Sequence, residues 1–179
     1  VDAPTAYTPL RGSYLGSLRL YGGGAAGAGA HVRAGMAFFD RFFLGVGLTT
    51  NNLIGEGRID SDNPGVGAKL RFLDEKRLRP SLAVGWESRG YGFKDMSGHY
   101  PRADRGVYLA ASKKLLDILL VHAGVSAAAL DKMEGVEDAL FHLGTTLTLF
   151  KALEIRGEWD DFSDRGGGRF NVEIRFTIE

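Results

Sequence analysis

The sequence predicts an all-β protein, specifically a ten-stranded antiparallel up-and-down transmembrane β-barrel. Three observations predict this fold class. Stretches that alternate apolar and polar residues follow one another along most of the 179-residue chain, which is the pattern of strands with one apolar face. The connections between these stretches alternate between short and long. Aromatic residues gather near the ends of the stretches, whereas aliphatic residues fill their middles.

The expected strands are long. Most match the roughly 9 to 11 residues with which a tilted strand crosses a bilayer, and they exceed the usual five or six residues, roughly, of a globular strand. Residues 1–12 are expected to form an extended lead-in, and residues 13–179 a single barrel domain. The ten strands are expected at 13–22, 29–39, 42–50, 64–73, 80–91, 105–113, 118–128, 139–149, 152–161 and 169–178.

The lengths of the connections suggest which end of the barrel faces which way. The short connections are 40–41, 74–79, 114–117 and 150–152. They join the second expected strand to the third, the fourth to the fifth, the sixth to the seventh and the eighth to the ninth, and the other connections are longer or more open. Outer-membrane barrels combine tight periplasmic turns with longer outer loops. An even number of strands also returns both termini to one side, so we expect both termini on the periplasmic side.

Residues 64–91 show the two faces of this pattern. Val66, Leu70 and Trp86 fall on an apolar face, which we expect to meet lipid, and Lys69 and Glu87 fall on a face of glycine, alanine and charge. Glycine, with 26 residues, is about twice as frequent as in average proteins. Inside a narrow barrel, small residues make room for long charged side chains from facing strands. A soluble ten-stranded barrel or sandwich, with the charged face in water, is the alternative. For residues 108–124 alone, a helix is the alternative to strands, since Ala, Leu and Lys favour helices.

The charged residues assigned to the lumen are the main candidate site. A charge inside a low-dielectric wall needs a partner or water, so we expect them to pair and to leave only a narrow lumen. In the last hairpin we expect Arg156 opposite Glu173 and Arg175 opposite Glu154, because the alternative register opposes like charges. The lumen set comprises Arg19, Arg33, Lys69, Arg71, Glu87, Arg89, Glu154, Arg156, Glu158, Asp160, Glu173 and Arg175.

Composition limits the chemistry of the chain. The net charge is zero, so no global field suggests nucleic acid as a partner. There is no cysteine, and the four histidines have no metal-ligand spacing, so we expect no metal and no cofactor. No catalytic residue is assigned. The weak candidate is His142, which plausible registers place opposite Glu158 or Asp160, because an acid beside a histidine can orient a general base. A buried polar pair is the simpler interpretation.

Four segments resemble a known group of envelope proteins. "TAYTPLRGSY", "FFDRFFLGVGLTTNNLIGEG", "NPGVGAKLRFLDEKRLRPSLAVGWESRGYG" and "GVYLAASKK" are similar to the uncharacterised outer-membrane barrels grouped with YjbH-like proteins. The resemblance runs from about Thr5 to Lys113. It implies an envelope barrel, and an association with exopolysaccharide production or export in some members. It implies no catalytic residues.

These observations lead to three functional hypotheses. The first is a structural or accessory component of the bacterial outer membrane, which contacts lipid and another envelope protein. The second is a narrow pore for small polar or anionic solutes, because basic residues slightly outnumber acidic ones in the expected lumen. The third is a membrane-embedded hydrolase centred on His142.

Overall fold

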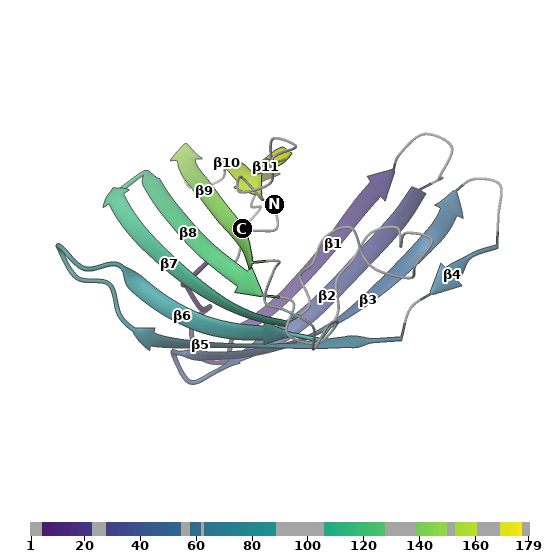
Figure 1. The fold of residues 1–179 in the computed structure, drawn as a ribbon, viewed down its shortest axis with the longest axis horizontal. Coiled ribbons are helices and arrows are strands. Elements are labelled where there is room, and N and C mark those ends of the chain that lie inside the picture. Colours follow the sequence, from purple (N-terminus) through teal and green to yellow (C-terminus); the bar gives the residue numbers. More distant parts are fainter. Residues whose placement is uncertain are drawn as a thin grey trace.

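The structure, a computed structural model, describes residues 5–22, 28–54, 58–61, 63–88, 106–127, 139–149, 153–160 and 169–176. These residues form strands and no helix (Figure 1). The strands are β1 (Tyr14–Gly22), β2 (Ala28–Phe38), β3 (Phe42–Ile54), β4 (Asp60–Ser61), β5 (Gly65–Leu73), β6 (Ser81–Glu87), β7 (Gly106–Leu116), β8 (Leu119–Ala127), β9 (Ala139–Leu149), β10 (Leu153–Asp160) and β11 (Arg169–Phe176).

The strands make one antiparallel sheet whose spatial order follows the chain. The order is β1-β2-β3-β5-β6-β7-β8-β9-β10-β11, and the two-residue β4 pairs with β3. All ten predicted strands are present. Two of them run further than expected: β3 continues to Ile54, where it pairs with β4, and β7 continues to Leu116. The segment 108–124 is divided between β7 and β8, so the helix alternative for this segment was wrong.

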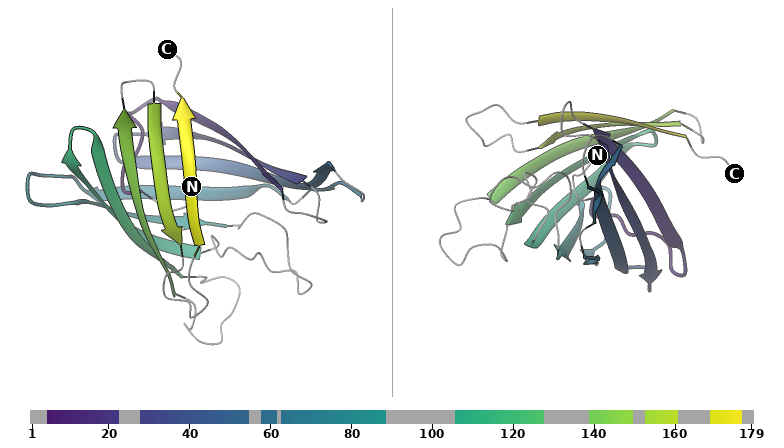
Figure 2. Two further views of the ribbon diagram at one scale, coloured as in Figure 1. Left: turned by 90° about the horizontal axis from the view of Figure 1, so that it is seen from above. Right: turned by 90° about the vertical axis from the view of Figure 1, so that its right-hand side faces the viewer.

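The sheet curls into a half-barrel, as Figures 1 and 2 show from three directions. Within the described residues, β1 and β11 are the two ends of the hydrogen-bonded order, and no pairing joins them. The prediction of an all-β antiparallel fold is confirmed. Closure into a barrel is not seen, and it stays a prediction.

All short connections lie at one end of the sheet, which we call the short-turn end. The register shows this, because Phe38 pairs with Phe42 and Leu116 with Leu119 beside such turns. β1 begins at this end, and β11 finishes there with Phe176 opposite Leu153. The first and last strands therefore start and stop on the same side, as an even number of long strands requires.

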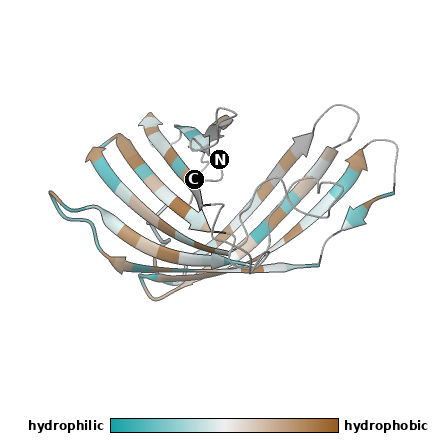
Figure 3. Ribbon diagram, viewed as in Figure 1, coloured by the Kyte–Doolittle hydropathy of each residue, from teal (hydrophilic) through white to brown (hydrophobic). Residues whose placement is uncertain are grey.

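The two faces of the curled sheet differ sharply in chemistry. On the convex face, directly paired residues form an apolar row from β3 to β9: Phe42, Leu70, Val84, Leu109, Val125 and Phe141. Large side chains of this face are exposed, among them Val66, Phe72, Trp86 and Leu143. Apolar and polar residues alternate along the strands that Figure 3 colours by hydropathy. The apolar face thus points outward, as the alternation predicted.

Candidate functional site

The concave face of the sheet is polar where a soluble protein would have its apolar core. A single row of paired residues crosses it from β6 to β10: Ser81, Ser112, His122, Gly144 and Glu158. Ser81, Ser112, His122 and Glu158 are the largest fully buried side chains among the described residues, each at most 2% exposed. The largest fully buried side chains of this sheet therefore carry hydroxyl, imidazole and carboxyl groups.

Glycines on the concave face give these side chains their space. A Cβ on Gly67 would collide with the Glu87 carboxylate, and one on Gly85 would collide with the Tyr108 ring. Each of these glycines is paired directly with the residue that covers it. Long side chains thus lie flat across the neighbouring strand instead of standing up into the interior. The expectation that glycine makes room for long charged side chains is met at Gly67, whereas Gly85 makes room for the Tyr108 ring.

Arg33 and Glu87 form an ion pair that reaches over two intervening strands. Arg33 belongs to β2 and Glu87 to β6, so the pair crosses the concave face above β3 and β5. The guanidinium carbon of Arg33 also lies 5.9 Å from the centroid of the buried Phe43 ring, a distance at which a cation and a ring attract each other. The curvature of the sheet makes this contact possible, because it brings the two strands toward each other.

The remaining predicted lumen charges form separate local contacts. Arg71 lies near the short-turn end, where its Nε is 3.3 Å from Asp74 Oδ1 and its Nη2 donates to the Asp40 carbonyl at 2.7 Å. Arg156 Nη2 donates to Glu154 Oε2 at 2.7 Å within β10. The predicted set is therefore not one network.

Several predicted positions are described only through their backbone. The register of the last hairpin sets Glu154 opposite Arg175 and Arg156 opposite Glu173, so the pairing of unlike charges is confirmed. Arg19 pairs with the backbone position of His31. Arg89 lies outside the described residues.

His142 contacts a hydroxyl group in the interior. The register places Asp160, rather than Glu158, directly opposite His142. The Oγ atom of Ser126 on β8 lies 2.9 Å from Nε2 of His142, and both side chains are buried. Only the fold shows that Ser126 makes this contact.

The N-terminal segment 5–8 lies against the concave face at the short-turn end (Figure 1). Ala6 is completely buried in a cluster with Ala83, Tyr108 and Ala110, and its N–H donates to Ser112 Oγ at 2.8 Å. Residues 5–8 of the expected lead-in are therefore packed inside the curve of the sheet.

Lys69 makes the main polar contacts with residues 5–8. Lys69 Nζ donates to the carbonyl oxygens of Thr5 at 3.3 Å and Tyr7 at 2.5 Å. The Thr8 hydroxyl donates to the Asp40 carbonyl at 2.8 Å. A buried ammonium group is costly without partners, and here two backbone carbonyls of the N-terminal segment solvate the predicted lumen charge.

Tyr7 and Glu75 connect the same segment to the turn between β5 and β6. The Tyr7 hydroxyl donates to Glu75 Oε2, and Glu75 Oε1 lies 3.1 Å from Lys113 Nζ and accepts the Lys114 N–H at 3.0 Å. Burial and the neighbouring carboxylate raise the pKa of Tyr7 above its usual value. Burial alone would raise the pKa of Glu75, but the donated hydrogen bonds outweigh burial and hold this pKa below its usual value.

Replacing Glu75 with glutamine is expected to lower the free energy of unfolding by about 1 to 2 kcal/mol at neutral pH, because charge-assisted hydrogen bonds are replaced by weaker ones. The pKa of Glu75 is lower in the folded chain than its usual value of 4.5. The carboxylate therefore stabilises the fold above that pH, and this contribution is lost as the pH falls.

Urea titrations of the unchanged chain and the Glu75→Gln variant check this prediction. The difference between their free energies of unfolding should shrink below pH 4.5. Arg77→Gln, at an exposed position of the same turn, is the matched control. Its free energy of unfolding should equal that of the unchanged chain both at neutral pH and below pH 4.5. A Glu75→Gln effect that is equally large at low pH would contradict the assigned role of the carboxylate.

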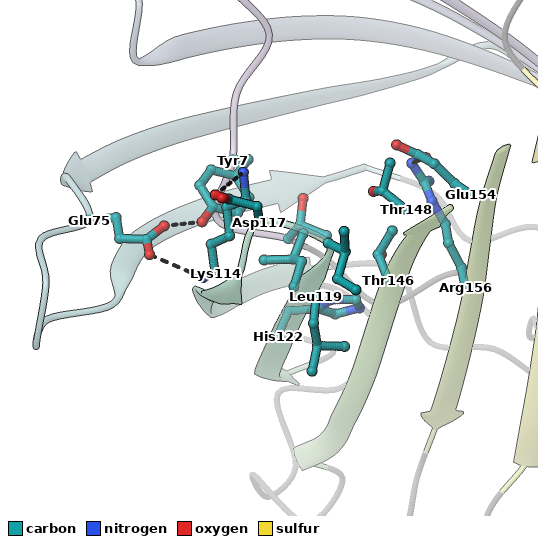
Figure 4. A pocket seen from close by; sticks show the side chains of 13 residues that line it. Tyr7, Glu75, Lys114, Asp117, Leu119, His122, Thr146, Thr148, Glu154 and Arg156 are labelled. Carbon is teal, nitrogen blue, oxygen red and sulfur yellow. Dashed lines mark hydrogen bonds and ion pairs between the residues drawn. The ribbon is translucent and has the colours of Figure 1, made fainter. Parts of the chain in front are cut away.

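A cavity of about 530 Å³ lies between the N-terminal segment and the concave face of β7 to β10 (Figure 4). Its lining includes Tyr7, Lys114, His122, Thr146 and Arg156. The charged groups in the lining are matched by partners, since Arg156 pairs with Glu154 and Lys114 Nζ lies 3.7 Å from Asp117 Oδ1. The cavity is thus polar, but its lining carries little uncompensated charge.

Sequence reasoning missed Tyr7, Glu75, Ser112 and the buried Ala6. The alternation Ala110, Ser112 places Ser112 on the inner face, which is a usable signal for its burial. No sequence signal points to the partners of the N-terminal segment, because they come from β5, β7 and two turns. Such contacts depend on the curl of the whole sheet.

No helix in the described part of the chain is long and apolar enough to cross a membrane. Comparisons of the chain with family models, with curated proteins and with solved structures found no significant match.

Proposed function

We propose that this chain is an integral outer-membrane β-barrel with a narrow, charge-filled lumen, and that it acts as a structural or accessory component of the envelope. One observation carries this proposal: the curled sheet exposes its large aliphatic and aromatic side chains on the convex face and buries polar side chains on the concave face. In water this arrangement is unfavourable, because it exposes apolar surface and buries polar groups. In a bilayer both faces are satisfied.

Strand lengths and chain ends support the same proposal. Seven of the ten long strands have nine or more residues and two more have eight, which is close to the roughly 9 to 11 residues that a tilted strand needs to cross a membrane. The short turns share one end with the start of β1 and the finish of β11. In the proposed orientation this end is periplasmic, and the barrel closes between β1 and β11.

The interior supports a limited role in transport. The Arg33–Glu87 ion pair crosses the concave face, and residues 5–8 pack against the same face, which does not favour a wide diffusion channel. The polar cavity of about 530 Å³ favours the second candidate, a narrow pore for small polar solutes. We assign no catalytic role to His142, whose contact with Ser126 satisfies a buried hydroxyl. A link to exopolysaccharide export rests on the resemblance to YjbH-like proteins alone.

Migration in detergent gels tests the membrane proposal. An outer-membrane barrel is expected to run faster before heating than after, and the chain should float with lipid vesicles in a density gradient. A chain that stays soluble and monodisperse without detergent would refute the proposal. Conductance in a planar bilayer then separates the two candidates, because an accessory barrel gives no current steps and a pore does.

A further inference from the structure

The site that holds residues 5–8 contacts backbone groups of the segment, and Glu75 also accepts a hydrogen bond from the Tyr7 hydroxyl. Lys69 binds two carbonyl oxygens of the segment, and Ser112 accepts one of its N–H groups. The side chain buried most deeply is the methyl group of Ala6, which lies among Ala83, Tyr108 and Ala110. The small residues Ala83 on β6 and Ala110 on β7 thus surround a small side chain. This is how a site for an extended peptide is built: main-chain contacts hold the peptide, and one pocket selects a side chain.

The segment is also separate from the sheet that it contacts. It meets β1 at a turn around Gly12, where φ is +77°, a conformation that glycine adopts readily. Ser13 N donates to Leu10 O at 3.0 Å within this turn, and Gly12 N donates to Ala37 O at 3.0 Å. Residues 5–8 can therefore leave the interior by rotation before Gly12, and the pairing of β1 with β2 would be unaffected.

The position of residues 5–8 lets them cover the interior at the short-turn end of the sheet. Their contacts reach Asp40 in one short turn and Glu75 in the next. They also reach Lys69 and Ser112 in the middle parts of β5 and β7. Thr5 and Tyr7 also form one wall of the polar cavity, as Figure 4 shows for Tyr7. The segment therefore covers the interior from the short-turn end.

We propose that residues 5–8 are a displaceable plug, and that the site holding them, formed by Lys69, Ser112 and the alanine pocket, binds an extended peptide with a small side chain at the position of Ala6. In the proposed barrel, which this part of the inference assumes, the plug closes the periplasmic mouth. A periplasmic peptide of the same chemistry could take its place.

Cysteine labelling tests the plug directly, because the natural chain has no cysteine. Ala6→Cys in the full-length chain is compared with Leu10→Cys, since Ala6 is 0% and Leu10 is 78% exposed. A water-soluble maleimide should label the Ala6→Cys chain about 100-fold more slowly than the Leu10→Cys chain, because labelling requires local opening. Adding Lys69→Met should raise the rate at the Ala6→Cys position by about tenfold, since it removes the ammonium that holds two carbonyls.

A free peptide tests the binding site itself. The peptide VDAPTAYTPLR, residues 1–11, should raise the labelling rate of the Ala6→Cys chain in a saturable way, because it occupies the vacated site. The same peptide with Ala6→Trp is the matched control and should have no effect, since the alanine pocket cannot hold an indole.

Three results would overturn the inference. The first is labelling of the Ala6→Cys chain as fast as that of the Leu10→Cys chain, which would mean that the segment is not seated. The second is labelling only after global unfolding, whether or not Lys69 is replaced, which would mean that the segment is a fixed part of the fold. The third is equal acceleration by both peptides. All measurements are made in detergent and need neither a bilayer nor conductance, so their failure is distinct from failure of the membrane proposal.

Discussion

Replacing Leu109 with arginine is expected to destabilise the folded chain in a bilayer by about 2 to 4 kcal/mol, the cost of a basic residue at the membrane midplane of a β-barrel. Leu109 is the fourth of the eleven residues of β7, and it lies between Val84 and Val125 in the apolar row of the convex face. Its side chain is 44% exposed. If the convex face met water, an arginine there would change stability by no more than about 0.5 kcal/mol. The loss of stability therefore differs clearly between a convex face in lipid and a convex face in water.

Leu116→Arg is the matched control for this experiment. Leu116 is also exposed, at 62%, but it is the last residue of β7 at the short-turn end. Near a membrane interface the expected cost falls to about 0 to 1 kcal/mol. Urea titrations of both variants in lipid vesicles measure the difference. Equal and near-zero effects at the two positions would mean that the convex face is not embedded in lipid.

Gly85→Val is expected to destabilise the chain by about 1 to 3 kcal/mol or more, because it overpacks a filled interior. A Cβ at Gly85 would lie closer to the Tyr108 ring than real Cβ atoms approach their neighbours. The ring is 9% exposed and belongs to the cluster around Ala6, so it has little room to move. The substitution should therefore also loosen the N-terminal segment.

Gly16→Val provides the matched control, because nothing lies within 4 Å of a Cβ at Gly16. Valine favours strands over glycine, so this variant should be unchanged or slightly more stable. Tyr108→Ala tests the mechanism as the second half of a double-mutant cycle. Once the ring is gone, Gly85→Val should cost much less, and a cost that is the same with and without the ring would rule out this collision as the cause.

Local patterns predicted much of the fold. The alternation placed Val66 and Leu70 on the exposed face, and the structure agrees. The charges of the last hairpin predicted its register, because only one pairing sets Arg156 opposite Glu173. The glycines were expected to lie beneath long side chains, and Gly67 lies beneath Glu87. Each of these features depends on residues within one strand or one hairpin, where side-chain period and pairing are strict.

Contacts across the interior were not predictable in this way. The Arg33–Glu87 pair spans two strands, and the Lys69 contacts join β5 to the start of the chain. Neither contact follows from the side-chain period of a strand or from the pairing register of a hairpin, since both depend on the curvature of the sheet. Ser126 and His142 lie on neighbouring strands but not opposite each other, so their hydrogen bond depends on side-chain direction as well as pairing.

The sequence by itself determined the strands, the order in which they pair and the face that each side chain takes, because strand period and turn length are local properties. Only the tertiary structure decided which charges meet, that residues 5–8 fill the short-turn end, and that Ser126 is the partner of His142. The physical reason is the curl of the sheet, which brings distant strands within the reach of a side chain and which no single strand or hairpin encodes.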